Sequence, residues 1–133
     1  MTRETLKLRL QYDNLLLGPG KAELMRHIRD TGSIAAAGRL MGMSYKRAWL
    51  LVEELNAAFP SPIILSARGG AGGGRAELSP LGCQLLTHYQ SIVAITEREA
   101  AHELAAIRAL LQPATAPKAP EEIAAAPPPE TDR

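Results

Sequence analysis

The chain has few of the residues that support cross-links, metal sites or base stacking. Its 133 residues include one cysteine, Cys83, so no disulfide can form within the chain, which favours a reducing compartment. The three histidines, His27, His88 and His102, are scattered and have no second cysteine nearby, so metal-ligand spacing is absent. Aromatic residues make up only 4% of the chain, which disfavours a stacking platform for single-stranded nucleic acid.

Long apolar runs are also missing. No stretch approaches the ~18 consecutive apolar residues of a membrane span. The N-terminal segment MTRETLKLRLQYD lacks the apolar centre of a secretion signal. We therefore expect a cytoplasmic protein that has no membrane partner.

The last part of the chain differs in composition from the rest. From Pro113 onward the sequence reads PATAPKAPEEIAAAPPPETDR, which holds six of the ten prolines and almost no large apolar side chain. Such a segment cannot bury enough surface to offset the entropy lost on ordering, so we predict a disordered Pro/Ala-rich tail over residues 113–133. The formal net charge is +1, and because this tail is acidic, residues 1–112 carry +3, a mild bias.

The glycine-rich stretch RGGAGGGRAEL, residues 68–78, comes close to a phosphate-binding loop. Gly69 and Gly74 stand at the two glycine positions of G-x-x-x-x-G-K-[ST]. Arg75, however, replaces the lysine that reaches the phosphates, and Ala76 replaces the hydroxyl that binds magnesium. These departures argue against nucleotide binding.

The N-terminal third changes from a strand-like to a helical pattern. Leu6, Leu8 and Leu10 alternate with cations, which is the period of a half-buried strand, and residues 15–17 give a second short apolar run. From residue 21 the apolar spacing becomes helical and predicts a first helix that ends at Thr31-Gly32.

Two further helices follow at close spacing. Ser33 is a good N-cap for a short alanine-rich helix that ends at Gly42, and Ser44 caps a third helix. The third helix has an apolar stripe at Ala48, Leu51, Val52, Leu55 and Phe59. A helix, a short helix, a tight glycine turn and another helix are typical of a helix-turn-helix.

The first turn of the third helix, SYKRAW, presents polar and aromatic side chains opposite the apolar stripe. Lys46 points most directly outward, with Leu50 and Glu53 beyond it, at about 100° per residue. The candidate DNA-binding residues here are Ser44, Tyr45, Lys46, Arg47 and Trp49. The alternative is an ordinary solvated helix start with Trp49 at the edge of the core.

The glycine-rich stretch fits the tip of a β-hairpin. Residues 63–67 form an apolar run suited to a strand, and residues 75–78 form its returning partner. A hairpin after a recognition helix is the wing of a winged helix, and a glycine tip can approach a sugar-phosphate backbone closely. The candidate contacts are Arg68, Gly70, Gly72 and Arg75. The alternative is a solvated hairpin end.

A long helix is predicted after the wing. Ser79 as N-cap and Pro80 at the first helical position open it, and an apolar stripe continues to about residue 112. A helix of ~30 residues is ~45 Å long and outreaches a small domain, so we expect it to pair with a second copy. The candidate dimerisation residues are Leu85, Leu86, Tyr89, Val93, Leu104, Ile107 and Leu111. Alternatively, its end folds back on its own domain or frays.

The combination of these motifs resembles a known family. The run GSIAAAGRLMGMSYKRAWLLVEELN, followed by SPIILSARGGAGGGRAELSPLGCQLL, is similar to the N-terminal DNA-binding domain of the molybdate-responsive ModE regulators, and more distantly to LysR-type regulators. The resemblance implies a winged-helix dimer on a palindromic operator, with residues 44–47 at the start of the recognition helix and residues 68–75 in the wing. In that family, domains after the dimerisation helix bind the oxyanion, whereas this chain continues into a Pro/Ala-rich tail. We therefore expect DNA binding and dimerisation but not molybdate sensing.

The predicted fold is mainly α with a small β wing. It comprises a winged helix-turn-helix DNA-binding domain over residues 1–79, a long C-terminal dimerisation helix over residues 80–112, and the tail over residues 113–133. The predicted function is that of a dimeric transcriptional regulator that binds double-stranded DNA, with no cofactor and no evident small-molecule ligand. The alternative is a winged-helix module that partners or antagonises a longer regulator. An enzyme is least favoured, because Cys83 has no catalytic base near it in sequence.

Overall fold

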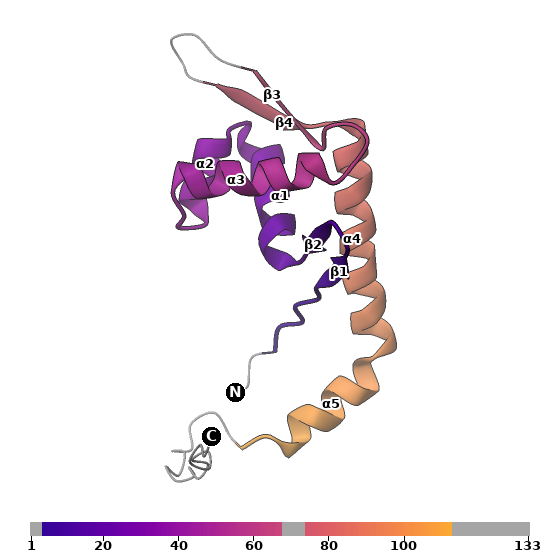
Figure 1. The fold of residues 1–133 in the computed structure, drawn as a ribbon. Helices are drawn as coiled ribbons and strands as arrows, with labels where there is room; N and C mark the ends of the chain where they lie inside the picture. Colours follow the sequence, from indigo (N-terminus) through magenta and orange to yellow (C-terminus); the bar gives the residue numbers. More distant parts are fainter. Residues whose placement is uncertain (1–3, 68–73, 113–133) are drawn as a thin grey trace, which may run out of the picture. The chain divides into compact units, whose positions relative to one another are not determined.

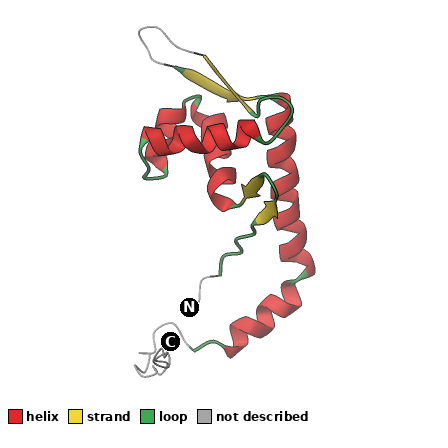
Figure 2. Cartoon of the chain, viewed as in Figure 1, coloured by secondary structure: helices red, strands yellow, loops and turns green. Residues whose placement is uncertain are grey.

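The computed structural model describes residues 4–67 and 74–112. The described residues fall into two units, one within residues 6–98 and the other formed by residues 4–5 with 99–112. Figure 1 traces the elements along the sequence and Figure 2 colours them by type. In chain order they are β1 (Leu10–Tyr12), β2 (Leu15–Leu17), α1 (Pro19–Thr31), α2 (Ile34–Leu40), α3 (Tyr45–Ala57), β3 (Ile64–Ala67), β4 (Arg75–Leu78), α4 (Pro80–Glu99) and α5 (Ala101–Leu110).

Three helices form the centre of the larger unit. The helix α2 packs against both α1 and α3. Leu24, Met25 and Ile28 of α1 are fully shielded from solvent, as is Leu55 of α3. The predicted stripe of α3 is confirmed, since Ala48, Leu51, Val52 and Leu55 are buried and Phe59 packs against the core. Burial of this apolar surface fixes which face of α3 remains in solvent.

Two glycines end the first two helices and set the turns between them. Gly32 (φ 73°) caps α1, and Gly42 (φ 72°) follows α2, both in the left-handed region that glycine adopts without steric cost. Where α2 meets α3, Gly38 of α2 lies so close to α3 that an added Cβ would stand 3.1 Å from the Cβ of Ala48. The tight helix-turn-helix spacing predicted from the sequence is therefore present.

The hairpin β3–β4 follows α3 in the position of a wing (Figure 1). Its strands pair antiparallel from Ile64 opposite Leu78 to Ala67 opposite Arg75. The amide of Ala76 also donates to the carbonyl oxygen of Gly32 at 2.9 Å, which joins β4 to the end of α1. The helices and the small hairpin are compatible with the predicted winged helix.

One side chain fastens α3 to the first strand of the wing. The Oδ1 atom of Asn56 accepts hydrogen bonds from the amides of Ile63 (2.8 Å) and Ile64 (3.0 Å), and its Nδ2 donates to the carbonyl oxygen of Ile64 at 3.2 Å. Both isoleucines are buried, so these backbone groups depend on Asn56 in place of water.

The N-terminal hairpin β1–β2 is shorter on its first side than the sequence predicted. Leu6 and Leu8 are half-buried in the predicted alternation, but only Leu10 of that run belongs to β1, which pairs with β2 from Leu10 opposite Leu17. The hydroxyl of Tyr89 on α4 donates to the carbonyl oxygen of Leu8 at 2.6 Å. This bond anchors the segment before β1 to α4 without strand pairing.

The predicted helix over residues 80–112 is two helices in the structure. Ser79 caps α4 as expected, since its Oγ accepts from the amide of Gly82 at 2.9 Å. At Ala100 the backbone leaves the helical conformation (φ −98°, ψ 12°), and α5 then runs only to Leu110. No residue of α5 is buried, so core packing does not stabilise this helix.

Candidate nucleic-acid interface

The start of α3 is fixed by an N-cap. The Oγ atom of Ser44 accepts a hydrogen bond from the amide of Arg47 at 3.0 Å, as predicted for a capping serine. The first turn of α3 contains no acidic residue. The other free amides and the helix dipole therefore give this end a partial positive charge, which favours an anion such as a phosphate.

The candidate side chains of α3 all lie in solvent. Lys46 and Arg47 are exposed, and the exposed fractions of Tyr45 and Trp49 are 57% and 42%. Neither ring belongs to the core or packs against it. The structure thus separates α3 into a buried apolar face and an outer face with cations and aromatic rings.

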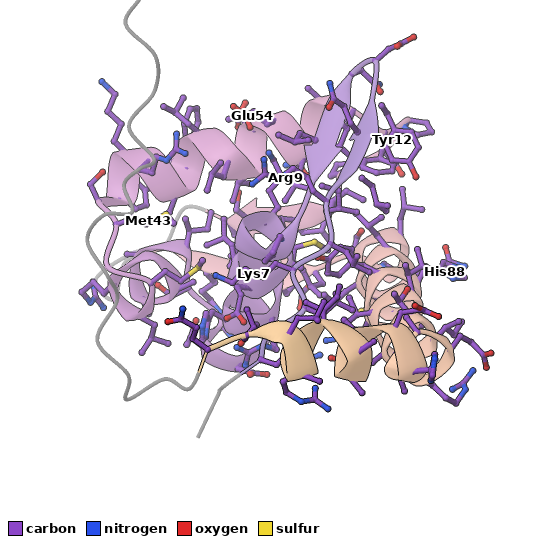
Figure 3. All side chains as sticks on the ribbon, turned by 90° about the horizontal axis from the view of Figure 1, so that it is seen from below. Lys7, Arg9, Tyr12, Met43, Glu54 and His88 are labelled. Atoms are coloured by element: carbon purple, nitrogen blue, oxygen red, sulfur yellow. The ribbon has the colours of Figure 1, made fainter. Side chains whose placement is uncertain are left out.

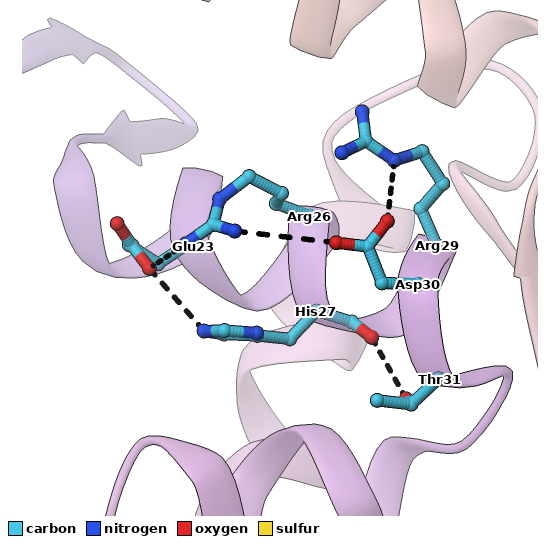
Figure 4. Close-up of polar contacts among 6 residues, drawn as sticks. All are labelled: Glu23, Arg26, His27, Arg29, Asp30 and Thr31. Atoms are coloured by element: carbon cyan, nitrogen blue, oxygen red, sulfur yellow. Dashed lines mark hydrogen bonds and ion pairs between the residues drawn. The ribbon is translucent and has the colours of Figure 1, made fainter.

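Cations on α1 behave differently from those at the start of α3. On α1, Arg26 lies 2.7 Å from Glu23 and 4.0 Å from Asp30, and Arg29 lies 3.0 Å from the same aspartate (Figure 4). His27 lies 3.3 Å from Glu23 in the same network. These carboxylates neutralise the cationic surface of α1.

Lys46, Arg47 and Arg75, in contrast, make no side-chain ion pair or hydrogen bond with any described residue. Lys7 and Arg9, on the segment before β1 (Figure 3), are also unpaired within the described part of the chain, whereas Lys21 lies 3.0 Å from Glu54 of α3. The unpaired cations at the start of α3 and at the base of the wing keep their full charge on an exposed surface, where each can meet a phosphate.

The base of the wing lies beside the start of α3. Tyr45 and Arg75 line the same hollow of about 70 Å³, together with the N-terminal end of α2 around Ser33 and Ile34. The bond from Ala76 to Gly32 fixes β4 at this place. Arg75 is therefore brought close to the first turn of α3, although 30 positions separate it from Tyr45 in the sequence. The other wing candidates, Arg68, Gly70 and Gly72, lie outside the described residues.

Comparison with known proteins gives a consistent set of relatives, although no protein-family model matches the chain. “Transcriptional regulator ModE” from Yersinia pestis is 34% identical over 93 residues, which are 70% of this chain and 35% of that protein. “DNA-binding transcriptional dual regulator ModE” from Escherichia coli K12 has the same identity and coverage. “Molybdenum-pterin-binding protein MopB” from Rhodobacter capsulatus is 41% identical over 85 residues, 64% of this chain and 32% of that protein. The chain is ModE-like.

The ModE-like chain spans about a third of the length of these relatives. The aligned region is nevertheless extensive, because its 93 residues exceed the combined length of α1, α2, α3 and the wing. The resemblance that the sequence motifs indicated is therefore confirmed.

Two of the predicted dimerisation residues lie inside the ModE-like chain's own core. Leu86 and Tyr89 are buried, with 3% and 6% of their surfaces exposed, so a second copy would have to displace the core to reach them. Leu85 and Val93 pack partly against the same core. In the other unit, Leu104 is half-buried, whereas Ile107 and Leu111 are 57% and 54% exposed. The apolar stripe of α4 thus serves first to hold this helix on its own domain.

Sequence reasoning missed two features of this surface. Arg39, in the last turn of α2, is exposed and unpaired among the described residues. Its place just before the glycine turn at Gly42 was the available signal, because the first helix of a helix-turn-helix crosses the nucleic-acid backbone. The role of Asn56 in holding the wing could not be predicted from the sequence, because its side chain bonds backbone groups on the far side of a loop.

Neither a metal centre nor a membrane helix is found in the described part of the chain. Residues 4–67 and 74–112 contain no group of three His, Cys, Asp or Glu side chains that could hold a metal ion. None of the helices in those ranges combines the length and apolar character needed to cross a membrane.

Proposed function

We propose that this protein is a sequence-specific transcriptional regulator that binds double-stranded DNA through α3 and the wing. The observation that carries the proposal is the set of exposed, unpaired cations at the capped start of α3 and at the base of β4. The names of the ModE relatives, one of which is a DNA-binding transcriptional regulator, support it.

Each side chain has a role that follows from its chemistry. Lys46 and Arg47, at the N-terminal end of α3, are placed to contact guanine edges or phosphates in the major groove. Tyr45 donates a hydrogen bond to a phosphate or contacts a thymine methyl, and Trp49 flanks the same turn. Arg75 and the wing tip contact the sugar-phosphate backbone, and Arg39 adds a phosphate contact from α2.

The protein acts on DNA as a dimer in this proposal. Two copies place their α3 helices in successive major grooves, about 34 Å apart on one face of the duplex. The side chains available for pairing are the exposed ones, Ile92 and Ile95 on α4, Ile107 and Leu110 on α5, and Leu111 just after it. Leu86 and Tyr89 support the dimer only indirectly, by holding α4 in place.

Binding to duplexes selected from a random pool tests the proposal. Lys46→Ala should weaken binding to the selected sequence about 5- to 150-fold, the factor for a lost base contact of ~1–3 kcal/mol. Lys7→Ala removes the same charge from another exposed, unpaired lysine and should leave affinity within about twofold. Equal affinities for the two variants would refute a reading role for Lys46.

Molybdate is a second variable in the same assay. All the proposed DNA contacts lie in α2, α3 and the wing, so the affinity of this chain for DNA should be equal with and without molybdate. A molybdate-dependent change in affinity would show that the present chain binds the oxyanion, contrary to the proposal.

The exposed apolar side chains of α4 and α5 support one other candidate, a module that binds a longer regulator. Leu110 is 83% exposed and Ile95 is 48% exposed, as in surfaces that pair with another protein. If the protein bound no duplex even at low salt, this candidate would be favoured over DNA binding.

A further inference from the structure

The outer face of α3 contains a leucine that no core contact explains. Leu50 is 42% exposed and belongs neither to the buried core nor to the side chains packed against it. Its neighbours Leu51 and Val52 are buried, with 7% and 3% exposed. The burial pattern therefore turns Leu50 away from the protein interior and toward solvent.

Leu50 follows Lys46 on the outer face of the helix. The two residues are four positions apart, so they lie one above the other at a separation of ~6 Å along the helix axis. Base pairs in a duplex are stacked ~3.4 Å apart. When the first turn of α3 reads base edges, Leu50 faces the groove about two base-pair steps away.

The aromatic neighbour strengthens this placement. Trp49 is exposed to the same extent, 42%, and also lies outside the core. Further along the helix, Glu53 is exposed and has no ion-pair partner among the described residues. Along the helix, the outer face therefore presents a cation, then two exposed apolar side chains, then a carboxylate.

An apolar side chain in the major groove has one complementary feature to contact. Of the groups on the base edges, the C5-methyl of thymine is the apolar one, and it is absent from the other three bases. Lys46 and the capped helix end recognise guanine or phosphate, and neither can recognise this methyl group.

We propose that Leu50 is a specificity-determining residue that contacts a thymine methyl group in the operator, one in each half-site. The inference rests on the proposed DNA-binding function and adds a defined base preference to it. Contact with water is removed from both the leucine and the methyl group when they meet, so the interaction favours thymine over cytosine and over uracil at that position.

Deoxyuridine offers a direct test, because it keeps the Watson–Crick edge and O4 of thymine and lacks only the methyl group. The duplex that the wild-type protein selects from a random pool is resynthesised with each thymine in turn replaced by deoxyuridine. Dissociation constants are then measured by fluorescence anisotropy. Burial of one methyl-sized group corresponds to about a fourfold change in affinity.

The inference predicts that replacing one particular thymine in each half-site by deoxyuridine weakens wild-type binding about fourfold. Leu50→Ala should bind the thymine and deoxyuridine duplexes equally at that position and remain sensitive at any others. Leu16→Ala is the matched control, because Leu16 on β2 is also 42% exposed, and it should keep the full wild-type deoxyuridine profile.

Two results would overturn the inference while leaving DNA binding intact. One is a wild-type protein whose affinity is unchanged by deoxyuridine at every position. This result does not depend on whether a variant folds. The other is a Leu50→Ala protein that is as sensitive as wild type at every position. Failure of the wild-type protein to bind any duplex would instead refute the proposed function itself, and with it the role of Leu50.

Discussion

Gly82 shows how one residue decides the contact between α4 and the wing. It is buried in the first turn of α4, and a Cβ added to it would overlap the carbonyl oxygen of Ile63. That oxygen already accepts hydrogen bonds from the amide and hydroxyl of Ser79, at 2.9 and 3.1 Å. No room is left between α4 and the segment that enters β3.

Gly82→Ala should therefore destabilise the protein by ~1–3 kcal/mol, the usual cost of overpacking. Gly20→Ala is the control, because Gly20 lies in helix α1 with nothing within 4 Å of an added Cβ. That change should leave stability unchanged or raise it by up to ~1 kcal/mol. Urea denaturation measures both, and equal stabilities for the two variants would contradict this packing.

Tyr89 makes stability depend on alkaline pH. Burial raises the pKa of the Tyr89 phenol above its ordinary value, and its hydroxyl donates to the Leu8 carbonyl oxygen. The neutral form is thus favoured in the folded state. Its stabilisation is fully present below the unfolded-state pKa of about 10 and is lost as pH rises through the higher folded-state pKa.

Tyr89→Phe should lower stability by ~0.5–1.5 kcal/mol at neutral pH, through loss of the hydrogen bond. Above about pH 10 its stability should fall less steeply than that of the wild type, so the difference between the two proteins narrows. Tyr12→Phe, at a tyrosine that is 58% exposed, should follow the wild-type curve. Parallel wild-type and Tyr89→Phe curves would argue against burial of a neutral phenol.

At the scale of elements, the wing is held by Asn56 as well as by its own strand pairing. Asn56→Ala leaves the amides of Ile63 and Ile64 without their acceptor, which should cost ~1–3 kcal/mol. Asn14→Ala removes a single exposed bond to the Ala58 carbonyl oxygen and should cost less. Amide hydrogen exchange should also be faster in β3 of the Asn56 variant. Unchanged exchange there would contradict a role for Asn56 in holding the wing.

The helices and the wing strands were predictable because their signals are local. Ser33 and Ser44 cap helices as their sequence positions indicate, and Gly32 and Gly42 end helices where only short-range backbone geometry matters. The strand β4 begins at Arg75 and returns beside β3, as the glycine-rich turn indicated.

Long-range features were harder to predict. The apolar stripe from residue 80 onward has no proline or glycine near Ala100, so periodicity alone predicted one helix where the structure has two. The same stripe could not distinguish side chains buried in one copy, such as Leu86, from side chains free to meet a second copy, such as Ile107. Burial depends on tertiary packing, which periodicity does not specify.

At the scale of the whole molecule, charge placement outweighs net charge. The formal charge of +1 gives no reason to expect a nucleic-acid partner. On α1, Arg26 and Arg29 are neutralised within the helix and Lys21 by Glu54 of α3, while Arg39, Lys46, Arg47 and Arg75 are unpaired within the described part of the chain. A nearly neutral protein can therefore present a cationic surface on α2, α3 and β4.

The salt dependence of DNA binding tests this claim most directly. With about four or five phosphates neutralised per copy, log Kd for a bound dimer should rise with log salt concentration with a slope of about 7 to 9 between roughly 50 and 200 mM. Arg75→Ala should weaken binding to all sequences alike and lower the slope by about 1 for each copy. A slope near zero, or an Arg75→Ala slope equal to that of the wild type, would contradict a phosphate-binding surface on α3 and the wing.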